Sequence, residues 1–414
     1  MSSLVELPSE LIDAIATSLP SSDLLNLRLT CAELDAKSFH QFTEGYFRAK
    51  QFMYSRYALD ALVEISKSRL GRYVRAVSLG PEFSQPDLTD RGHMGEARNR
   101  ILEWLKEYEN DNRQMERTGL DNLMLHEAFQ NLPNCEGIEF RDYSLADYGT
   151  DSFGEASFNR NVGQDIVNLR EPYPFRSLSR AFTLTLEAAQ AARLWIKWVI
   201  VQVADTYELC RPALEFPRPP KELDTFTFSH LRVFKVSINN GYAQTAEDDS
   251  LRRYTDFLAR TPQLRLLGLS FLSYYDTAEI FNRLVSASKN LTELEVISMY
   301  VSEDELLEPI LRLAPTLRSL RISGVILHTG TWQSVYGRLR DDMRLTKIEI
   351  ECVEDVNPIS YLGTDKVARY SGQTEICYDG PDMKHFLNSL TNCIVSTDGN
   401  GGSLTGIDPR YFVV

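Results

Sequence analysis

Apolar residues recur along most of this chain with the spacing L-x-x-L-x-L, in which Ile, Val or Phe can replace Leu. Five copies follow one another at intervals of 26 to 33 residues and begin at Leu231, Leu264, Leu291, Leu317 and Leu345. Two earlier matches begin at Val74 and Cys135. Alternate side chains of an extended strand lie on opposite faces, so this spacing predicts short strands with one buried face.

Helical patterns lie between these predicted strands. Ser302 is followed three residues later by Glu305, and Asp276 by Glu279, a spacing typical of the first turn of a helix. Residues 332–339 carry apolar side chains at helical spacing. Each unit therefore reads as strand, loop, helix and loop. Such units cannot bury their apolar faces alone and are expected to stack on one another.

The strand pattern resembles leucine-rich repeats, although only Asn239 matches the Asn or Cys that usually follows at the ninth position. For residues 74–414 the resemblance implies an α/β fold, an irregular solenoid with parallel strands on its concave face and helices outside. A non-repeat α/β domain is the alternative. Residues 141–176 interrupt the rhythm and predict a long loop with aromatic side chains, and residues 188–203 predict a helix.

Three short helices are predicted near the N-terminus, over residues 7–34. The first carries apolar residues at helical spacing and stops at Pro20, after which serines are expected to cap the second. Thr30 and Glu33 have the spacing of a capping box for the third. Leu11 and Ile15 share one stripe of the first helix, beside a second apolar stripe. A unit this small cannot bury every apolar face, so an outside partner is expected.

These N-terminal residues resemble the F-box, and residues 39–52 resemble fungal members of that family. The family docks on the Skp adaptor, which bridges to a cullin scaffold. The resemblance implies an F-box over 1–50, followed by a helical linker over 51–73. The implied adaptor contacts are Leu7, Pro8, Leu11, Ile15, Leu19, Pro20, Leu24, Leu27, Leu29 and Cys31. Many F-boxes carry a Trp just after this segment, where the present chain has Ala-Glu-Leu-Asp.

The alternate residues of the predicted strands are candidates for binding a protein substrate. The charged candidates are Lys235, Glu295, Arg321, Glu349 and Glu351, and the long loop adds Tyr148 and Phe153. Acids gather toward the C-terminal repeats, which favours a substrate of basic character. The alternative interpretation is an ordinary solvated face.

Composition and charge narrow the class of protein. The chain has 414 residues and a net charge of −14, which argues against a nucleic-acid partner because such proteins carry basic surfaces. No apolar run has the length of a membrane span, and the first Lys or Arg is Arg28, so no signal peptide is expected. We therefore expect a cytoplasmic or nuclear protein without a membrane partner. The six cysteines contain no CxxC pair and predict free thiols.

Catalytic motifs give little support to an enzyme. Cys377 could act as a thiol nucleophile with Asp379 and His385, which lie close to it in sequence. The HExxH, GxSxG and P-loop motifs are absent from the sequence. The histidines lack metal-ligand spacing, and no metal or cofactor is expected. The sequence thus favours the non-catalytic substrate-recognition subunit of a Skp–cullin–F-box ubiquitin ligase. A repeat scaffold whose F-box-like region does not serve ubiquitination is the second interpretation, and an enzyme is the third.

Overall fold

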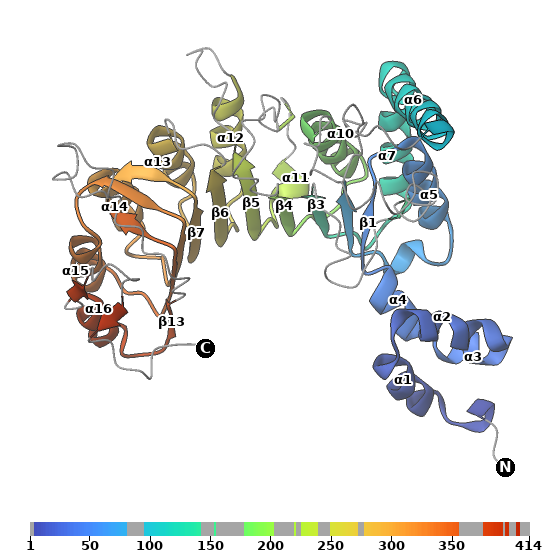
Figure 1. Cartoon of the computed structure of the whole chain (residues 1–414), viewed down its shortest axis with the longest axis horizontal. Coiled ribbons are helices and arrows are strands. Elements are labelled where there is room, and N and C mark those ends of the chain that lie inside the picture. The colour runs from blue at the N-terminus through green and yellow to red at the C-terminus, as the bar shows by residue number, and fades with distance from the viewer. Residues whose placement is uncertain are drawn as a thin grey trace. The chain divides into compact units, whose positions relative to one another are not determined.

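A computed structural model describes residues 4–80, 95–141, 153–154, 178–202, 219–220, 225–238, 249–271, 277–355, 376–391, 394–396 and 403–405. The chain forms two compact units, 1–175 and 176–414. Both units combine helices with strands that pair mostly in parallel, which confirms the α/β class (Figure 1).

The first unit begins with helices and continues into a small sheet. Its described elements are η1 (Leu4–Glu6), α1 (Ser9–Ser18), α2 (Ser21–Thr30), α3 (Ala32–Lys37), α4 (Phe39–Tyr46), β1 (Ala49–Phe52), α5 (Arg56–Lys67), η2 (Gly71–Tyr73), β2 (Ala76–Leu79), α6 (Gly95–Thr118), α7 (Leu120–Gln130) and β3 (Gly137–Arg141). The three helices predicted over residues 7–34 are present as α1, α2 and α3, and α4 follows them.

The ends of these helices differ from the predicted caps. Pro20 occupies the N-cap position of α2, without a side-chain cap. Thr30 is the last residue of α2, where its hydroxyl donates to the Leu27 carbonyl at 2.6 Å. Cys31, in an extended conformation, separates α2 from α3. The capping box predicted from Thr30 and Glu33 is therefore wrong, because Thr30 still belongs to the preceding helix.

Residues 51–73 are largely helical, as predicted, because α5 and η2 occupy most of them, and the segment also packs into the core of the first unit. The segment starts within β1, which pairs in parallel with β2, and β2 pairs in parallel with β3. Residues 51–55 are all buried, and the Tyr54 hydroxyl donates to Asp121 Oδ2 at 2.9 Å. β1 has only four residues, Ala-Lys-Gln-Phe, whose burial does not alternate, so the pattern search did not find it.

The second unit is built around one long run of strands. Its helices are α10 (Leu178–Ala191), α11 (Thr225–Phe228), α12 (Asp249–Ala259), α13 (Thr277–Ala287), α14 (Glu303–Arg312), α15 (Trp332–Asp342) and α16 (Met383–Thr391). Its main strands are β4 (Trp198–Gln202), β5 (Val233–Ile238), β6 (Leu266–Phe271), β7 (Glu293–Ile297), β9 (Ser319–Ser323), β11 (Lys347–Glu351) and β13 (Ile376–Asp379). The shorter strands are β8 (Tyr300–Ser302), β10 (Ile326–Thr329), β12 (Glu354–Asp355), β14 (Ile394–Ser396) and β15 (Ser403–Thr405).

The five copies of the apolar pattern form the five neighbouring strands β5, β6, β7, β9 and β11. Successive strands pair in parallel in chain order, and all fifteen pattern residues are buried. The two earlier matches form β2 and β3 of the first unit. The strands predicted from this pattern are therefore confirmed. After β11 the direction changes, because β13 pairs with it antiparallel.

One strand of the series was not predicted. Ile196, Val199 and Val201 have the same apolar spacing and are fully buried in and before β4, which pairs in parallel with β5. The helix predicted over residues 188–203 is wrong beyond Ala191, where α10 ends. Arg193 then adopts a left-handed φ of 53°, a conformation that commonly terminates helices.

The three C-terminal repeats share a turn that the sequence did not reveal. Seven residues after the first apolar position, Ser298, Gly324 and Cys352 have φ values of 58°, 62° and 49°. Each turn leads from the main sheet into β8, β10 or β12, which form a second parallel sheet. The Ser298 N–H donates to the Ser323 carbonyl at 2.8 Å and the Gly324 N–H to the Glu351 carbonyl at 3.0 Å, so successive turns stack.

This second sheet explains why the ninth position departs from the leucine-rich-repeat pattern. Met299 and Val325 occupy that position directly after the left-handed residue and are fully buried. The Met299 carbonyl accepts a hydrogen bond from the Ile326 N–H at 2.7 Å, within the β8–β10 pairing. An apolar residue fits here because the next strand covers it, whereas an Asn would need polar partners.

Replacing Gly324 with alanine is expected to lower the free energy of unfolding by about 1–2 kcal/mol, since the left-handed conformation strains any residue with a Cβ. An added Cβ would also lie 3.3 Å from Ser298 Oγ. Gly337→Ala is the matched control, because no atom lies within 4 Å of its added Cβ and it stands inside α15. That substitution should stabilise the chain by about 0.5–1 kcal/mol. Urea denaturation measures both changes, and shifts of the same sign would contradict the expectation.

The predicted capping box of α14 is confirmed. Ser302 Oγ accepts a hydrogen bond from the Glu305 N–H at 3.2 Å, and Glu305 Oε2 accepts one from the Ser302 N–H at 2.8 Å. This backbone bond to Ser302 is the main reason that the pKa of Glu305 is lowered. The predicted stripe over 332–339 is also confirmed, since Trp332, Val335, Tyr336 and Leu339 are all buried in α15.

Candidate protein-binding surfaces

Exposed apolar side chains gather in the N-terminal helices. Among the described residues, nine large apolar side chains are exposed, and five of them fall within the first thirty residues. We call these five the N-terminal apolar surface: Leu4, Leu11, Ile15, Leu25 and Leu29. Such a concentration in so short a segment is typical of a binding surface, whereas single exposed apolar residues are ordinary.

Helical spacing positions the members of this surface. In α1, Ile12 and Ala16 are buried where the helix contacts α3 and α4, and Leu11 and Ile15 form the neighbouring exposed stripe. This confirms the division into two stripes expected from the sequence. In α2, Leu25 and Leu29 have the same separation of four residues, and Leu29 is 84% exposed.

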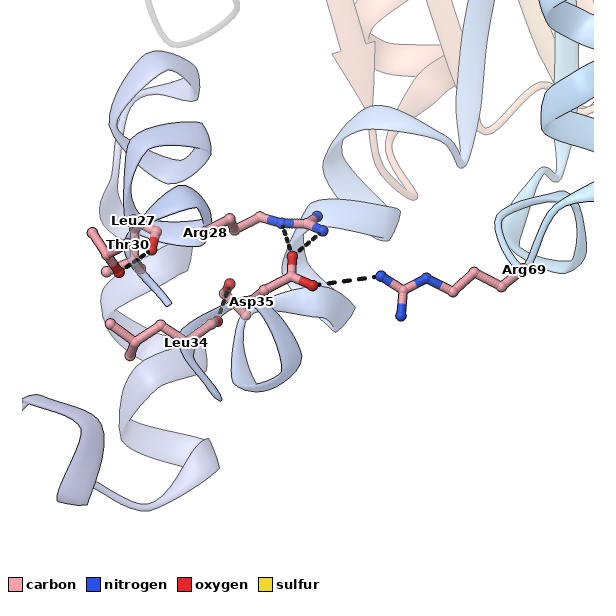
Figure 2. A network of polar contacts seen from close by, with 7 residues as sticks. Leu27, Arg28, Thr30, Leu34, Asp35 and Arg69 are labelled. Carbon is pink, nitrogen blue, oxygen red and sulfur yellow. Dashed lines mark hydrogen bonds and ion pairs between the residues drawn. The ribbon is translucent and has the colours of Figure 1, made fainter. Parts of the chain in front are cut away.

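Polar contacts around Arg28 fix α2 to the helices that follow it (Figure 2). Arg28 Nε donates to Asp35 Oδ1 at 2.9 Å, and a second Arg28 nitrogen binds the same oxygen. The other oxygen of Asp35 lies 3.5 Å from Arg69 Nη2, so Asp35 joins α2 to the segment after α5. The Arg28 guanidinium also lies over the Phe42 ring, 3.4 Å from its centroid. These contacts join the C-terminal end of α2, which carries the exposed Leu29, to α3 and α4.

Lys37 fixes the chain entering α1. Its Nζ donates to the Val5 carbonyl at 2.5 Å and the Leu7 carbonyl at 3.0 Å. Glu33 Oε1 lies 2.9 Å from the same ammonium. The segment carrying Leu7 and the exposed Pro8 is therefore tied to α3, beside the N-terminal apolar surface.

Most residues that the F-box resemblance selects are accessible. Six are exposed: Pro8, Leu11, Ile15, Pro20, Leu29 and Cys31. Three are half-buried: Leu7, Leu19 and Leu27. Leu24 differs from this expectation, because its side chain is only 6% exposed and packs inside the helical module. Leu4 and Leu25 were missed, although the i, i+4 spacing of Leu25 with Leu29 could have indicated the latter.

The predicted substrate-binding charges lie side by side on one face of the second unit's sheet. Lys235, Gly268, Glu295, Arg321 and Glu349 occupy equivalent positions in β5, β6, β7, β9 and β11. Lys235 Nζ reaches across Gly268 to Glu295 Oε2 at 2.7 Å. A Cβ on Gly268 would lie 2.9 Å from Lys235 Cγ, so the glycine leaves room for this ion pair.

Arg321 and Lys347 on this face are also paired. Arg321 lies 3.6 Å from Glu349 and 3.5 Å from Glu351, measured from Nε and Nη2 to Oε2. Lys347 Nζ lies 2.6 Å from Glu349 Oε1, and this hydrogen bond is the main reason that the pKa of Lys347 is raised. The acids near the C-terminal repeats are therefore largely offset, and the expectation of a basic substrate loses its support.

The aromatic loop gives a different result. Tyr148 lies outside the described residues. Phe153 is half-buried against the edge of β1, where its N–H donates to the Gln51 carbonyl at 2.8 Å. Its ring packs on Phe52 and Tyr57, with centroids 5.8 and 6.0 Å away. Phe153 thus completes the core edge of the first unit rather than standing free to bind a substrate.

The candidate catalytic residues are spread over two elements. Cys377 and Asp379 lie in β13, where Cys377 stands opposite Glu349 of β11. His385 is exposed on α16. Because Glu349 is a carboxylate, its position opposite Cys377 does not stabilise a thiolate there. Within the described ranges, no group of three or more His, Cys, Asp or Glu side chains is placed to hold a metal ion.

Comparison with known proteins adds no family assignment. No protein-family model matches the chain, and no curated protein matches it. Among the helices that the structure describes, none has the length and apolar content needed to cross a membrane. The functional interpretation therefore depends on the residues and contacts described above.

Proposed function

We propose that this chain is the substrate-recognition subunit of a Skp–cullin–F-box ubiquitin ligase. The N-terminal apolar surface carries the proposal, because three of its five exposed side chains, Leu11, Ile15 and Leu29, stand at positions that resemble the adaptor contacts of an F-box. Burying one such side chain contributes about 1.5–3 kcal/mol before association entropy is subtracted. Several together supply enough free energy for a specific protein contact.

The second unit would hold the protein substrate. Its sheet face offers alternating cations and carboxylates in fixed register, which favours a partner with a matching charge pattern. In this role the chain catalyses no reaction. It binds the adaptor and the substrate together and so raises the effective concentration of the substrate near the conjugating enzyme.

Adaptor binding tests the proposal directly. Leu29→Asp and Ile15→Asp should each weaken binding of the purified chain to the Skp adaptor by about 30-fold or more, because a charge replaces an anchor in a desolvated contact. Both side chains are exposed, so the fold should tolerate the change. Leu123→Asp is the matched control, since Leu123 is 66% exposed on α7 and lies outside the N-terminal apolar surface. Calorimetry or a pull-down provides the measurement.

A repeat scaffold without a ubiquitin role is the second candidate. The observation that favours it is the polar segment Ala32–Asp35, where many F-boxes carry a Trp. A wild-type chain that retains no adaptor would exclude the ligase proposal and support the scaffold. Loss of binding in the Leu123 control as well would show that the effect is unspecific.

A further inference from the structure

A second row of equivalent residues crosses the strands of the second unit near their N-terminal ends. In each repeat the residue that follows the first buried apolar position donates its N–H to the carbonyl of its equivalent in the preceding repeat. These bonds measure 2.7 to 2.9 Å. The row consists of Lys197, Arg232, Arg265, Thr292, Arg318 and Thr346. Neighbouring members are about 4.8 Å apart, the spacing of paired strands.

Two arginines of this row are exposed and unpaired. Within the part of the chain that the structure describes, neither Arg232 nor Arg265 makes an ion pair or a side-chain hydrogen bond. Arg318 differs, since its guanidinium donates to the Leu317 carbonyl at 2.7 Å and the Pro315 carbonyl at 2.9 Å. Like charges on neighbouring strands repel each other, so an anionic ligand would relieve a cost that the free chain carries.

An aromatic cluster adjoins these arginines. Trp195 is 56% exposed and stacks on His230, with centroids 4.9 Å apart and rings inclined by 13°. Phe226, also exposed, lies 6.2 Å from Trp195 between ring centroids. His230 lies in a turn two residues before Arg232, and the Arg232 N–H donates at 2.7 Å to the carbonyl of Lys197, two residues after Trp195. The aromatic cluster and Arg232 are therefore close neighbours in the second unit.

We propose that this surface, defined by Trp195, Phe226, His230, Arg232 and Arg265, binds an acidic peptide segment of a partner protein that also carries an apolar or aromatic side chain. The arginines would pair with carboxylates, and the exposed rings would cover the apolar side chain. Although the chain's net charge is −14, Arg232 and Arg265 make this surface locally positive, and that local charge is complementary to an acidic partner.

Its size fits a peptide better than a nucleic acid. Cations occupy three successive positions of the row and end at Thr292, a span of about 10 Å. An extended peptide of three or four residues covers that length at about 3.3 Å per residue. A nucleic acid would need a longer basic track to release counterions. The proposal goes beyond adaptor binding and does not depend on it, because the surface lies in the second unit.

Fluorescence anisotropy with labelled hexapeptides tests the inference on the purified full chain. The probe combines glutamates with two phenylalanines, and the charge-inverted probe has lysines instead of the glutamates. We expect the acidic probe to bind and the lysine probe not to bind. Arg232→Glu combined with Arg265→Glu should weaken the acidic probe about tenfold or more, and Trp195→Ala about fivefold. Raising the salt from about 0.05 to 0.5 M should weaken binding as well.

Arg283→Glu combined with Arg338→Glu is the matched control, because it changes the net charge equally at exposed positions of α13 and α15. This variant should keep at least half of the wild-type affinity. Equal binding of both peptide probes, no binding of the acidic probe, or affinity unaffected by Arg232→Glu and Arg265→Glu would overturn the proposal. Tighter, arginine-dependent binding of an oligodeoxythymidine would also overturn it in favour of a nucleic-acid surface. Adaptor binding should be unchanged in all variants, which separates this result from the proposed function.

Discussion

Replacing Leu320 with alanine should lower the free energy of unfolding by about 2–5 kcal/mol, the range for removing a fully buried leucine from a packed core. Leu320 is the second apolar position of its repeat and lies in β9, between β7 and β11. In stacked repeats each strand covers its two neighbours, so a cavity in β9 weakens both interfaces.

Ser319→Ala is the matched control for Leu320, because Ser319 is the adjacent residue in β9 and is only half-buried. Its replacement should change the free energy of unfolding by less than about 0.5 kcal/mol. Urea denaturation followed by tryptophan fluorescence measures both, since Trp332 is buried in α15 of the same repeat. Comparable effects of the two substitutions would show that the apolar pattern does not define the core of the second unit.

Arg28→Ala is expected to lower the local stability of α2 and α3 by about 2–4 kcal/mol. A charge-assisted hydrogen bond contributes about 1.5–3 kcal/mol, and a partly desolvated cation–π contact about 0.5–2 kcal/mol. Arg28 makes both, to Asp35 and Phe42, with its side chain only 11% exposed. Adaptor binding should weaken as well, because Leu29 would lose its fixed helix end.

Native-state hydrogen exchange on the full chain measures this effect at individual amides of α2 and α3. Arg28→Lys separates the two contributions, because lysine keeps the charge but loses the planar group that binds Asp35 through two nitrogens and stacks on Phe42. It should restore less than half of the lost protection. Unchanged exchange in Arg28→Ala would contradict the role given to this network.

Much of the strand order could be predicted because burial imposes a local period. Leu294 and Val296 are separated by the polar Glu295, and a polar residue separates the same two apolar positions in most of the predicted strands. β1 was not predicted because its four residues, exposed or half-buried at Ala49 and Lys50 and buried at Gln51 and Phe52, do not alternate. β4 escaped because Ile196, Val199 and Val201 lie in an apolar stretch that also suits a helix. Only the left-handed turn at Arg193 decides between the two structures.

For the candidate sites, the sequence indicated the positions of the residues but not their burial or their pairing. The spacing of Leu11 and Ile15 indicated one of two apolar stripes on α1. Which stripe is exposed, and the burial of Leu24, depend on how α1 and α2 pack against α3. The charges of the sheet face were found as alternates of the pattern. Their neutralisation was not, because Lys235 and Glu295 come from strands 60 residues apart and meet only across Gly268.

The sequence by itself determined which residues face the core, since a period of two or of 3.6 is a local property that hydrophobic burial enforces. It also determined that the N-terminal helices have more apolar surface than they can cover alone. The tertiary structure decided which charges are satisfied. Register across the sheet pairs Arg321 with Glu349 yet leaves Arg232 and Arg265 adjacent to each other and without a carboxylate among the described residues. Such contacts depend on distances between segments far apart in the chain, which no local pattern encodes.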